Sequence, residues 1–220
     1  MLRLSGFIFI VLVLSTSCTN KEVKTNYYES GTISSELHYN NNKLDGESRY
    51  YYENGNLQSI FKYKNGVLDG KATTWFLNEN VESVTHYKNG MMEGRKEYYF
   101  ENGNLAKIEN YHHDTLNGEV QTYHENGKIK TKGYYKMGLY DSTWLYTDQY
   151  GLLVGQAEFH NGSGNQIAYF ANGKTKRITP FKNNKIDGIV KFYKPSGELL
   201  KKEVYKDGEF IREIIPEAEK

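Results

Sequence analysis

The sequence predicts an all-β protein: a repeat array of about eight β-hairpin units of 24 residues that form one extended, twisted antiparallel meander sheet. Three observations predict this fold class. A motif typified by Tyr63 to Gly70 (Y-K-N-G-V-L-D-G) returns every 24 residues except for one interval of 22, and such periods are typical of repeat architectures. Residues that tolerate positive φ return at two fixed places in each unit. Aromatic residues make up 15% of the chain and hydrophobic residues only 38%, which favours a thin aromatic sheet over a thick aliphatic core.

The aromatic residue that opens the motif serves as the reference position of each unit. Its copies are Tyr39, Tyr63, Tyr87, Tyr111, Tyr135, Phe159, Phe181 and Tyr205. Turn residues, often an Asn-Gly pair, stand before and after it, and such pairs between apolar runs are the strongest short-range sign of a β-hairpin. Each unit is therefore expected to hold two turns and two strands, about sixteen strands in all. The glycines assigned to these turns are Gly55, Gly66, Gly70, Gly90, Gly94, Gly103 and Gly127.

The second strand of each unit is expected to run from an apolar residue to the reference aromatic six places later, as from Leu57 to Tyr63. Because six is even, both side chains are predicted to point to one face of the sheet. Helices are disfavoured, since no 3.6-residue period is sustained. Residues 141–166 lack the closing glycine in two units and precede a two-residue deletion, so a bulge or distorted turn is expected there.

The N-terminal residues 1–17 are predicted to be a lipoprotein-type signal peptide, with Arg3, an apolar stretch from Phe7 to Leu14 and small polar residues after it. That stretch is too short to span a bilayer, which needs about 20 residues. Cys18, the only cysteine, follows directly, and the pattern resembles a bacterial lipoprotein signal, which implies lipidation of Cys18. Ordinary secretion with cleavage after Ser17 is the alternative. The protein is accordingly expected in the bacterial cell envelope, anchored to the outer membrane or facing the periplasm.

The remaining chain divides by composition. Residues 18–26 are predicted to be a polar tether, residues 27–212 the repeat array and residues 213–220 a polar C-terminal tail. With 28 Lys and Arg against 27 Asp and Glu, the net charge is +1, and loss of Arg3 with the signal would leave the mature chain neutral. The absence of a basic surplus argues against nucleic acid as a partner.

The sequence shows no catalytic motif: there is no nucleophile elbow and no glycine-rich phosphate loop, so neither an enzymatic activity nor a cofactor is predicted. No metal site is predicted either. His38 and His86 are two repeats apart, about 19 Å along the sheet, and His112 and His113 are expected on opposite faces if the strand continues through both. The recurrent acids are too sparse for a Ca²⁺ repeat and are expected to bond the backbone of their own turn. They are Asp45, Asp69, Glu93, Asp141 and Asp187.

The order of aromatic, N-G, apolar, aromatic, K-N-G and D-G elements resembles the MORN repeat superfamily, in particular the bacterial variant found in proteins described as YwqK-type antitoxin components. The resemblance covers Tyr27 to about Arg212. It implies an all-β array of hairpins with a binding role, toward protein partners and sometimes phospholipid, and for the YwqK-like group the neutralisation of a toxin. It offers no catalytic residues.

The leading functional hypothesis is a lipid-anchored, non-enzymatic repeat scaffold of the envelope that binds a protein partner through recurrent aromatic side chains. The candidates are Tyr51, Tyr52, Trp75, Phe76, Tyr99, Phe100 and Tyr123. For most of them a structural role is the competing reading, because cross-strand aromatic pairs hold such a sheet together. The functional alternatives are a toxin-neutralising antitoxin or immunity protein and a module that binds cell-wall glycan, since exposed aromatic rings suit sugar faces.

Overall fold

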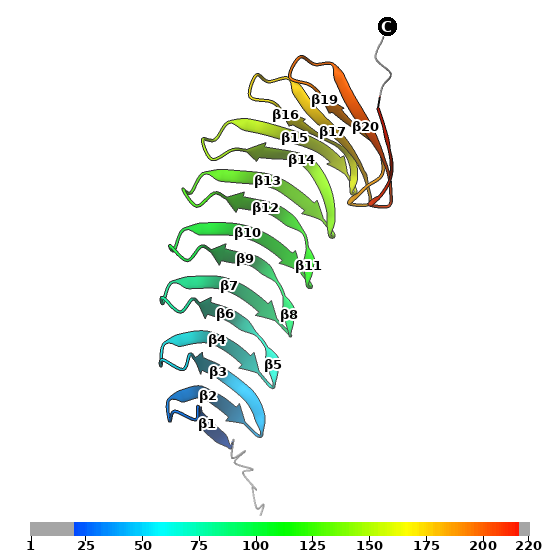
Figure 1. The fold of residues 1–220 in the computed structure, drawn as a ribbon. Coiled ribbons are helices and arrows are strands. Elements are labelled where there is room, and N and C mark those ends of the chain that lie inside the picture. The colour runs from blue at the N-terminus through cyan, green and yellow to red at the C-terminus, as the bar shows by residue number, and fades with distance from the viewer. Residues whose placement is uncertain (1–19, 216–220) are drawn as a thin grey trace, which may run out of the picture.

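The computed structural model describes residues 20–215, which form strands and turns in a single open sheet (Figure 1). Strands adjacent in the sheet are also consecutive along the chain, and every pairing is antiparallel, so the predicted all-β meander is confirmed. The strands are β1 (Lys21–Tyr27), β2 (Ile33–Asn40), β3 (Lys43–Tyr51), β4 (Leu57–Lys64), β5 (Val67–Leu68), β6 (Gly70–Trp75), β7 (Val81–Lys88), β8 (Met91–Met92), β9 (Gly94–Tyr99), β10 (Leu105–His112), β11 (Thr115–Leu116), β12 (Gly118–Tyr123), β13 (Ile129–Lys136), β14 (Leu139–Thr147), β15 (Leu153–His160), β16 (Ser163–Tyr169), β17 (Thr175–Lys182), β18 (Lys185–Ile186), β19 (Gly188–Tyr193), β20 (Leu199–Lys206) and β21 (Glu209–Ile214).

Four two-residue strands, β5, β8, β11 and β18, are the first parts of the strands that follow them. In the break between β5 and β6, the amide of Asp69 donates to the carbonyl of Lys62 at 2.9 Å, and Gly70 has a φ of 120°. A Cβ at Gly70 would lie 2.8 Å from the Lys62 side chain, so glycine leaves room for it. The break is therefore a built-in bulge, and each repeat contributes two strands as predicted.

The ends of the array differ from the sequence prediction. Strand β1 (Lys21–Tyr27) takes in residues 21–26 of the predicted tether 18–26 and pairs with β2 from Lys21 opposite Asn40 onward. At the other end, Glu213 and Ile214 of the predicted tail belong to β21. The sheet thus exceeds the predicted 27–212. A polar edge strand of this kind needs backbone pairing rather than burial, so its sequence lacks an apolar signal. The predicted signal peptide and Cys18 lie outside the described residues.

The turns at one edge of the sheet stack on one another from repeat to repeat. The amide of Gly66, whose φ is 86°, donates to the carbonyl of Leu44 in the preceding turn at 2.7 Å, and Gly90 does the same to Leu68. The recurrent acids reinforce this stack: Asp45 accepts from the amide of Asn65 at 3.2 Å. The expectation that these acids bond their own turn was wrong, because the stacked turn of the next repeat brings a free amide within reach of the carboxylate.

A bulge recurs at the other edge and changes which side chains share a face. Tyr50 lies opposite Ser59, but its neighbour Tyr51 lies opposite Leu57, so Gln58 has no partner. Leu57 and Tyr63 consequently point to opposite faces, and the prediction that they share one was wrong. The same register shift occurs in the other units, not only within residues 141–166 where irregularity was expected.

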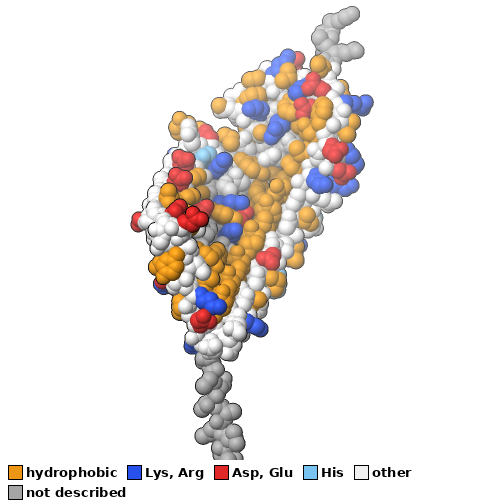
Figure 2. All heavy atoms as spheres, turned by 60° about the horizontal axis from the view of Figure 1, so that its bottom comes forward, with side chains coloured by type: hydrophobic (Ala, Val, Ile, Leu, Met, Phe, Trp, Pro, Cys, Tyr) orange, Lys and Arg blue, Asp and Glu red, His pale blue; other side chains and the backbone are white. Residues whose placement is uncertain are grey.

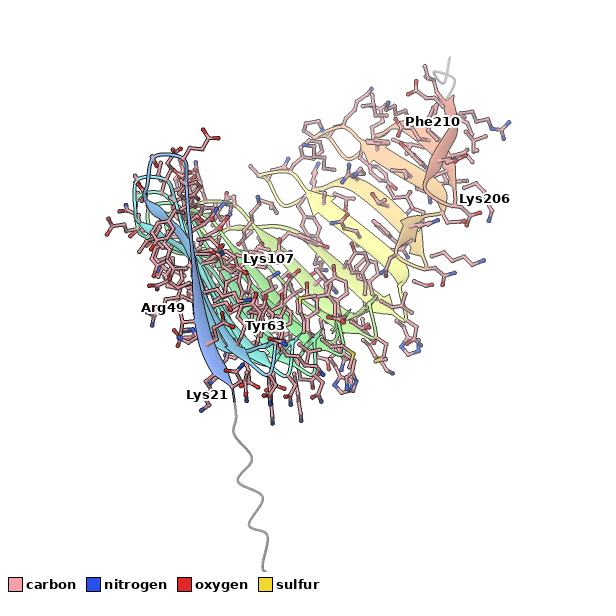
Figure 3. All side chains as sticks on the ribbon, turned by 90° about the horizontal axis from the view of Figure 1, so that it is seen from below. Lys21, Arg49, Tyr63, Lys107, Lys206 and Phe210 are labelled. Atoms are coloured by element: carbon pink, nitrogen blue, oxygen red, sulfur yellow. The ribbon has the colours of Figure 1, made fainter. Side chains whose placement is uncertain are left out.

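The sheet is a curved single layer whose concave face supplies the core. Figure 3 shows Tyr63 and Lys107 on the concave side and Arg49 on the convex side. Small side chains occupy the middle of the concave face in the N-terminal half, where Ser48 is 0% and Ala72 is 4% exposed. Residues directly opposite one another on paired strands share a face of the sheet. Ser48 and Ala72 are therefore covered by larger side chains from the adjacent strands, Leu37 opposite Ser48 and Thr85 opposite Ala72. In the C-terminal half a compact cluster forms around Val120, Trp144, Ala157 and Phe159.

Candidate functional site

A hollow runs along the concave face, and hydrophobic side chains form a continuous band on its floor (Figure 2). We call this the aromatic band and define it as the reference aromatics together with the apolar residues paired to them. It includes the pairs Tyr39–Leu44, Tyr63–Leu68, Tyr87–Met92, Tyr111–Leu116, Tyr135–Tyr140 and Phe181–Ile186. Most of these side chains are partly exposed. The band is therefore a partly exposed apolar surface that extends along the array.

The aromatic band is densest around Trp144. The Trp144 ring lies 4.9 Å from Tyr140 and 5.3 Å from Tyr135, centroid to centroid, and both contacts are edge-to-face. Such pairs contribute about 0.5–1.5 kcal/mol beyond the area they bury. Burial raises the pKa of the nearby Tyr146 hydroxyl to about 12, and burial also raises that of Tyr135, so both stay protonated near neutral pH. This part of the band acts as a packed core.

A charged group lies beside the band at Glu109, which is only 5% exposed. Lys107 Nζ lies 2.5 Å from Glu109 Oε1, and the Tyr111 hydroxyl donates to Glu109 Oε2 at 3.0 Å. Lys107 also lies over the Tyr98 ring, 5.6 Å from its centroid. Burial, followed by the bond to Glu109, raises the pKa of Tyr111, which removes it as a base near neutral pH. Lys201, Glu203 and Tyr205 repeat the arrangement near the C-terminus. The group satisfies its own charges and fits a structural or binding role better than acid–base chemistry.

The aromatic residues predicted to bind a partner do not form one site. Tyr51, Trp75, Tyr99 and Tyr123 belong to the convex face, because each follows a concave-face residue across the bulge. Tyr52, Phe76 and Phe100 open the turns, where the amide of each bonds a carbonyl four residues on. Several polar ends are engaged: the Tyr51 hydroxyl donates to Glu36 at 2.6 Å and the Tyr52 hydroxyl to the carbonyl of Trp75 at 2.8 Å. These bonds favour a structural role for many of the rings, and the aromatic band is the better binding candidate.

The seven glycines assigned to turns all have positive φ, between 80° and 120°. They lie in the turns or at the bulge that follows each turn. Residues other than Gly, Asn and Asp are strained in this positive-φ conformation. The histidines predicted to be solvent-facing also have local roles: Nδ1 of His86 lies 3.0 Å from the carbonyl of Arg95, across the bulge.

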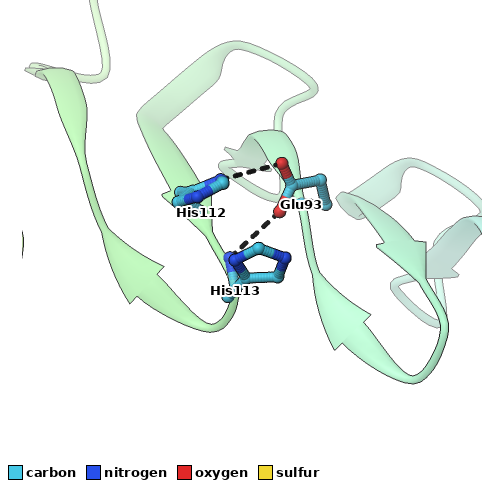
Figure 4. A group of neighbouring side chains, drawn as sticks. All are labelled: Glu93, His112 and His113. Atoms are coloured by element: carbon cyan, nitrogen blue, oxygen red, sulfur yellow. Dashed lines mark hydrogen bonds and ion pairs between the residues drawn. The ribbon is translucent and has the colours of Figure 1, made fainter.

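One cluster of metal-ligating side chains was missed in the sequence. Glu93, His112 and His113 come together at two stacked turns (Figure 4), and one ligand atom from each lies within 4.8 Å of the others. The two histidines would face opposite sides only within a strand, and β10 ends at His112, after which His113 turns with a φ of 47°. The signal was present in the alignment of the repeats, where this unit alone replaces Lys-Asn with His-His. Hydrogen bonds, first from the His113 amide and then from His112, lower the pKa of Glu93.

Comparison with known proteins identifies the repeat. A family model described as MORN repeat variant matches residues 23–41, 44–65, 68–89, 92–113, 116–137, 163–183 and 186–207. No curated protein gives a sequence match. The unit without a match contains Phe159 and the Trp144 cluster, where Ser142 with a φ of 59° departs from the motif. Within residues 20–215, no helix is long and apolar enough to cross a membrane. Since the seven matches cover more than half of the 220 residues, the chain belongs to the MORN repeat variant family.

Proposed function

We propose that the protein is a non-enzymatic repeat scaffold that holds a protein partner along its concave face. The observation that carries the proposal is the aromatic band, an extended apolar hollow on an open array. Exposed apolar surfaces of this extent mark interaction sites in soluble proteins. Neutralisation of a toxin, which the resemblance to YwqK-type proteins implies, would be one form of such protein binding.

Protein is favoured over cell-wall glycan because of how the two tryptophans lie. Sugar faces stack on exposed aromatic rings, and tryptophan offers the largest of these. Trp144 is 5% exposed and enclosed by Tyr135, Tyr140 and Phe159, so its ring has no free face. Trp75 lies on the convex face, opposite Val81, at the same repeat position as Tyr51 and Tyr99. These convex rings are partly buried, and the hydroxyls of Tyr51 and Tyr99 are bonded to Glu36 and Glu97, so the rings are less free to stack on sugar than fully exposed ones.

We further propose that Cys18 bears lipid and anchors the array in the bacterial envelope. Only Thr19 and Asn20 separate Cys18 from β1 in the sequence, so the lipid would hold the N-terminal edge of the sheet close to the membrane surface. A strand edge needs protection from pairing with other chains, and a membrane surface would supply part of that protection for β1.

Position-specific photocrosslinking tests the binding proposal. A photoreactive amino acid at Tyr87, in the aromatic band, is expected to capture a discrete envelope protein in a saturable manner. Lys71 is the matched control, because it is exposed and lies beside the buried, concave-facing Ala72 on β6. Equal capture from Lys71, or saturable retention on purified cell-wall sugar that is lost in Trp75→Ala, would contradict the proposal.

Incorporation of a labelled fatty acid tests the anchor. In the same cells, labelling is expected for the wild type and not for Cys18→Ser. Equal labelling of the two proteins would contradict the proposed lipid anchor.

A further inference from the structure

We propose that Glu93, His112 and His113 form a binding site for a divalent transition-metal ion of the Zn²⁺ class. Two imidazoles and one carboxylate are a ligand set that Zn²⁺ accepts, and a three-ligand site leaves a fourth position open. Within the described residues, 20–215, this is the one group of three His, Cys, Asp or Glu side chains whose ligand atoms converge. It lies at the turn-stacking edge of the sheet and is separate from the aromatic band.

The stacked turns position the three side chains. Glu93 occupies the break between β8 and β9, and its Oε2 accepts the amide of His113 at 3.0 Å. The carboxylate is thereby held beneath the next turn, with its second oxygen, Oε1, 3.0 Å from Nδ1 of His112. His113 is turned back by its positive φ, so its ring lies 4.2 Å from that of His112, centroid to centroid. Backbone geometry thus places both imidazoles on the same side of one carboxylate.

The separations are close to those a metal requires. Donor atoms around a tetrahedral Zn²⁺ lie about 3.4 Å apart, given bond lengths of about 2.0–2.2 Å. The three ligand atoms here lie within 4.8 Å of one another, and one pair is already at 3.0 Å. Both histidines are exposed, so small rotations of the rings close the remaining gap without disturbing packed neighbours. Oε2 of Glu93 keeps its hydrogen bond from the His113 amide. Oε1 would bind the metal in place of its hydrogen bond with His112 Nδ1.

The other repeats show that the fold itself does not require histidines at these positions. The same two positions are Lys88 and Asn89 one repeat earlier, where Asp69 accepts the amide of Asn89 at 3.2 Å. In the last repeat, Lys206 forms an ion pair of 3.0 Å with Asp187. A shorter acid and a lysine therefore satisfy the turn stack. The repeat at residues 92–113 differs at three positions. Glu93 replaces a shorter acid, and His112 and His113 replace Lys and Asn. Each change either introduces a metal ligand or extends one toward the site.

Calorimetric titration of the full chain with Zn²⁺ tests the site. The Zn²⁺ affinity of the wild type is compared with that of a variant that carries the Lys and Asn of the preceding turn. The wild type is expected to bind one Zn²⁺ in a saturable manner, whereas His112→Lys/His113→Asn is expected to lose at least 100-fold in affinity. That variant should melt at an unchanged temperature in the presence of a chelator, because Lys and Asn occupy these two positions in the preceding turn. Equal binding by the two proteins would overturn the proposal.

A gain-of-function variant gives an independent readout. Asp69→Glu/Lys88→His/Asn89→His transfers the ligand set to the preceding turn stack, which has the same backbone hydrogen bonds. The stoichiometry with Zn²⁺ is expected to rise from one to two, and bound Co²⁺ should give twice the visible absorption. A variant that melts like the wild type in chelator and still binds a single ion would show that the stacked turns do not position these ligands, which also overturns the proposal.

Discussion

Replacing Trp144 by Ala is expected to lower the free energy of unfolding by about 3–5 kcal/mol, the usual cost of removing a large buried aromatic side chain. Trp144 is 5% exposed and makes edge-to-face contacts with Tyr135, Tyr140 and Phe159. Its Nε1 donates to the carbonyl of Asp141 at 3.1 Å, so its polar atom is satisfied as well. Chemical denaturation followed by circular dichroism measures the change.

The adjacent residue on the other face provides the control for Trp144→Ala. Leu145 is 39% exposed on the convex side, and Leu145→Ala is expected to cost about 1 kcal/mol or less. Similar losses in the two variants would show that the concave cluster is not the core of the C-terminal half.

Replacing Gly133 by Ala is expected to destabilise the protein by about 1–3 kcal/mol through overpacking. A Cβ at Gly133 would lie 2.1 Å from Cδ2 of Trp144 and 2.4 Å from Cε2, which forces the ring to move. Gly133 lacks the Cβ atom that would clash, and its φ is not positive, so backbone strain is not involved. Thermal and denaturant unfolding measure the effect.

A double-mutant cycle separates this clash from other effects of Gly133→Ala. In a Trp144→Ala background the ring is absent, so the same substitution is expected to be nearly neutral. An undiminished cost in that background would contradict the proposed contact.

The period of the sequence predicted the meander because its turns depend on local chemistry. Residues such as Gly66 and Asn184 meet the positive φ of a stacked turn regardless of what packs nearby, with φ values of 86° and 64°. Local signals of this kind can be read without knowledge of the fold. The two strands per repeat follow from the spacing of those turns.

Features that depend on neighbouring repeats could not be predicted in the same way. The bulge between Leu57 and Tyr63 inserts one residue, and no glycine marks it in the sequence. The alternation of side chains along a regular strand therefore predicted the wrong face for Leu57. Asp45 reaches an amide 20 residues later, which only the stacking of turns brings close. The polar β1 owes its strand to pairing with β2, because its own side chains are exposed.

The sequence predicted an aromatic surface but assigned it to other residues than those that form the aromatic band. Aromatic residues were expected to form a binding surface, yet the chosen Tyr51 and Trp75 belong to the convex face. The reference aromatics themselves form the band, since they pair with Leu68, Met92 and their equivalents across the turn. The histidine pair was dismissed because a strand was assumed where a turn with positive φ occurs.

Deletion of one complete unit, Tyr63 to His86, tests the array most directly. The deletion joins Lys62 to Tyr87 in the same repeat position, and strands pair only with neighbours along the chain, so each remaining strand keeps an equivalent partner. Circular dichroism is expected to show the same spectrum per residue and a cooperative unfolding transition in the shortened protein. A deletion variant without a cooperative transition would contradict the account and indicate a closed domain in which distant units depend on one another.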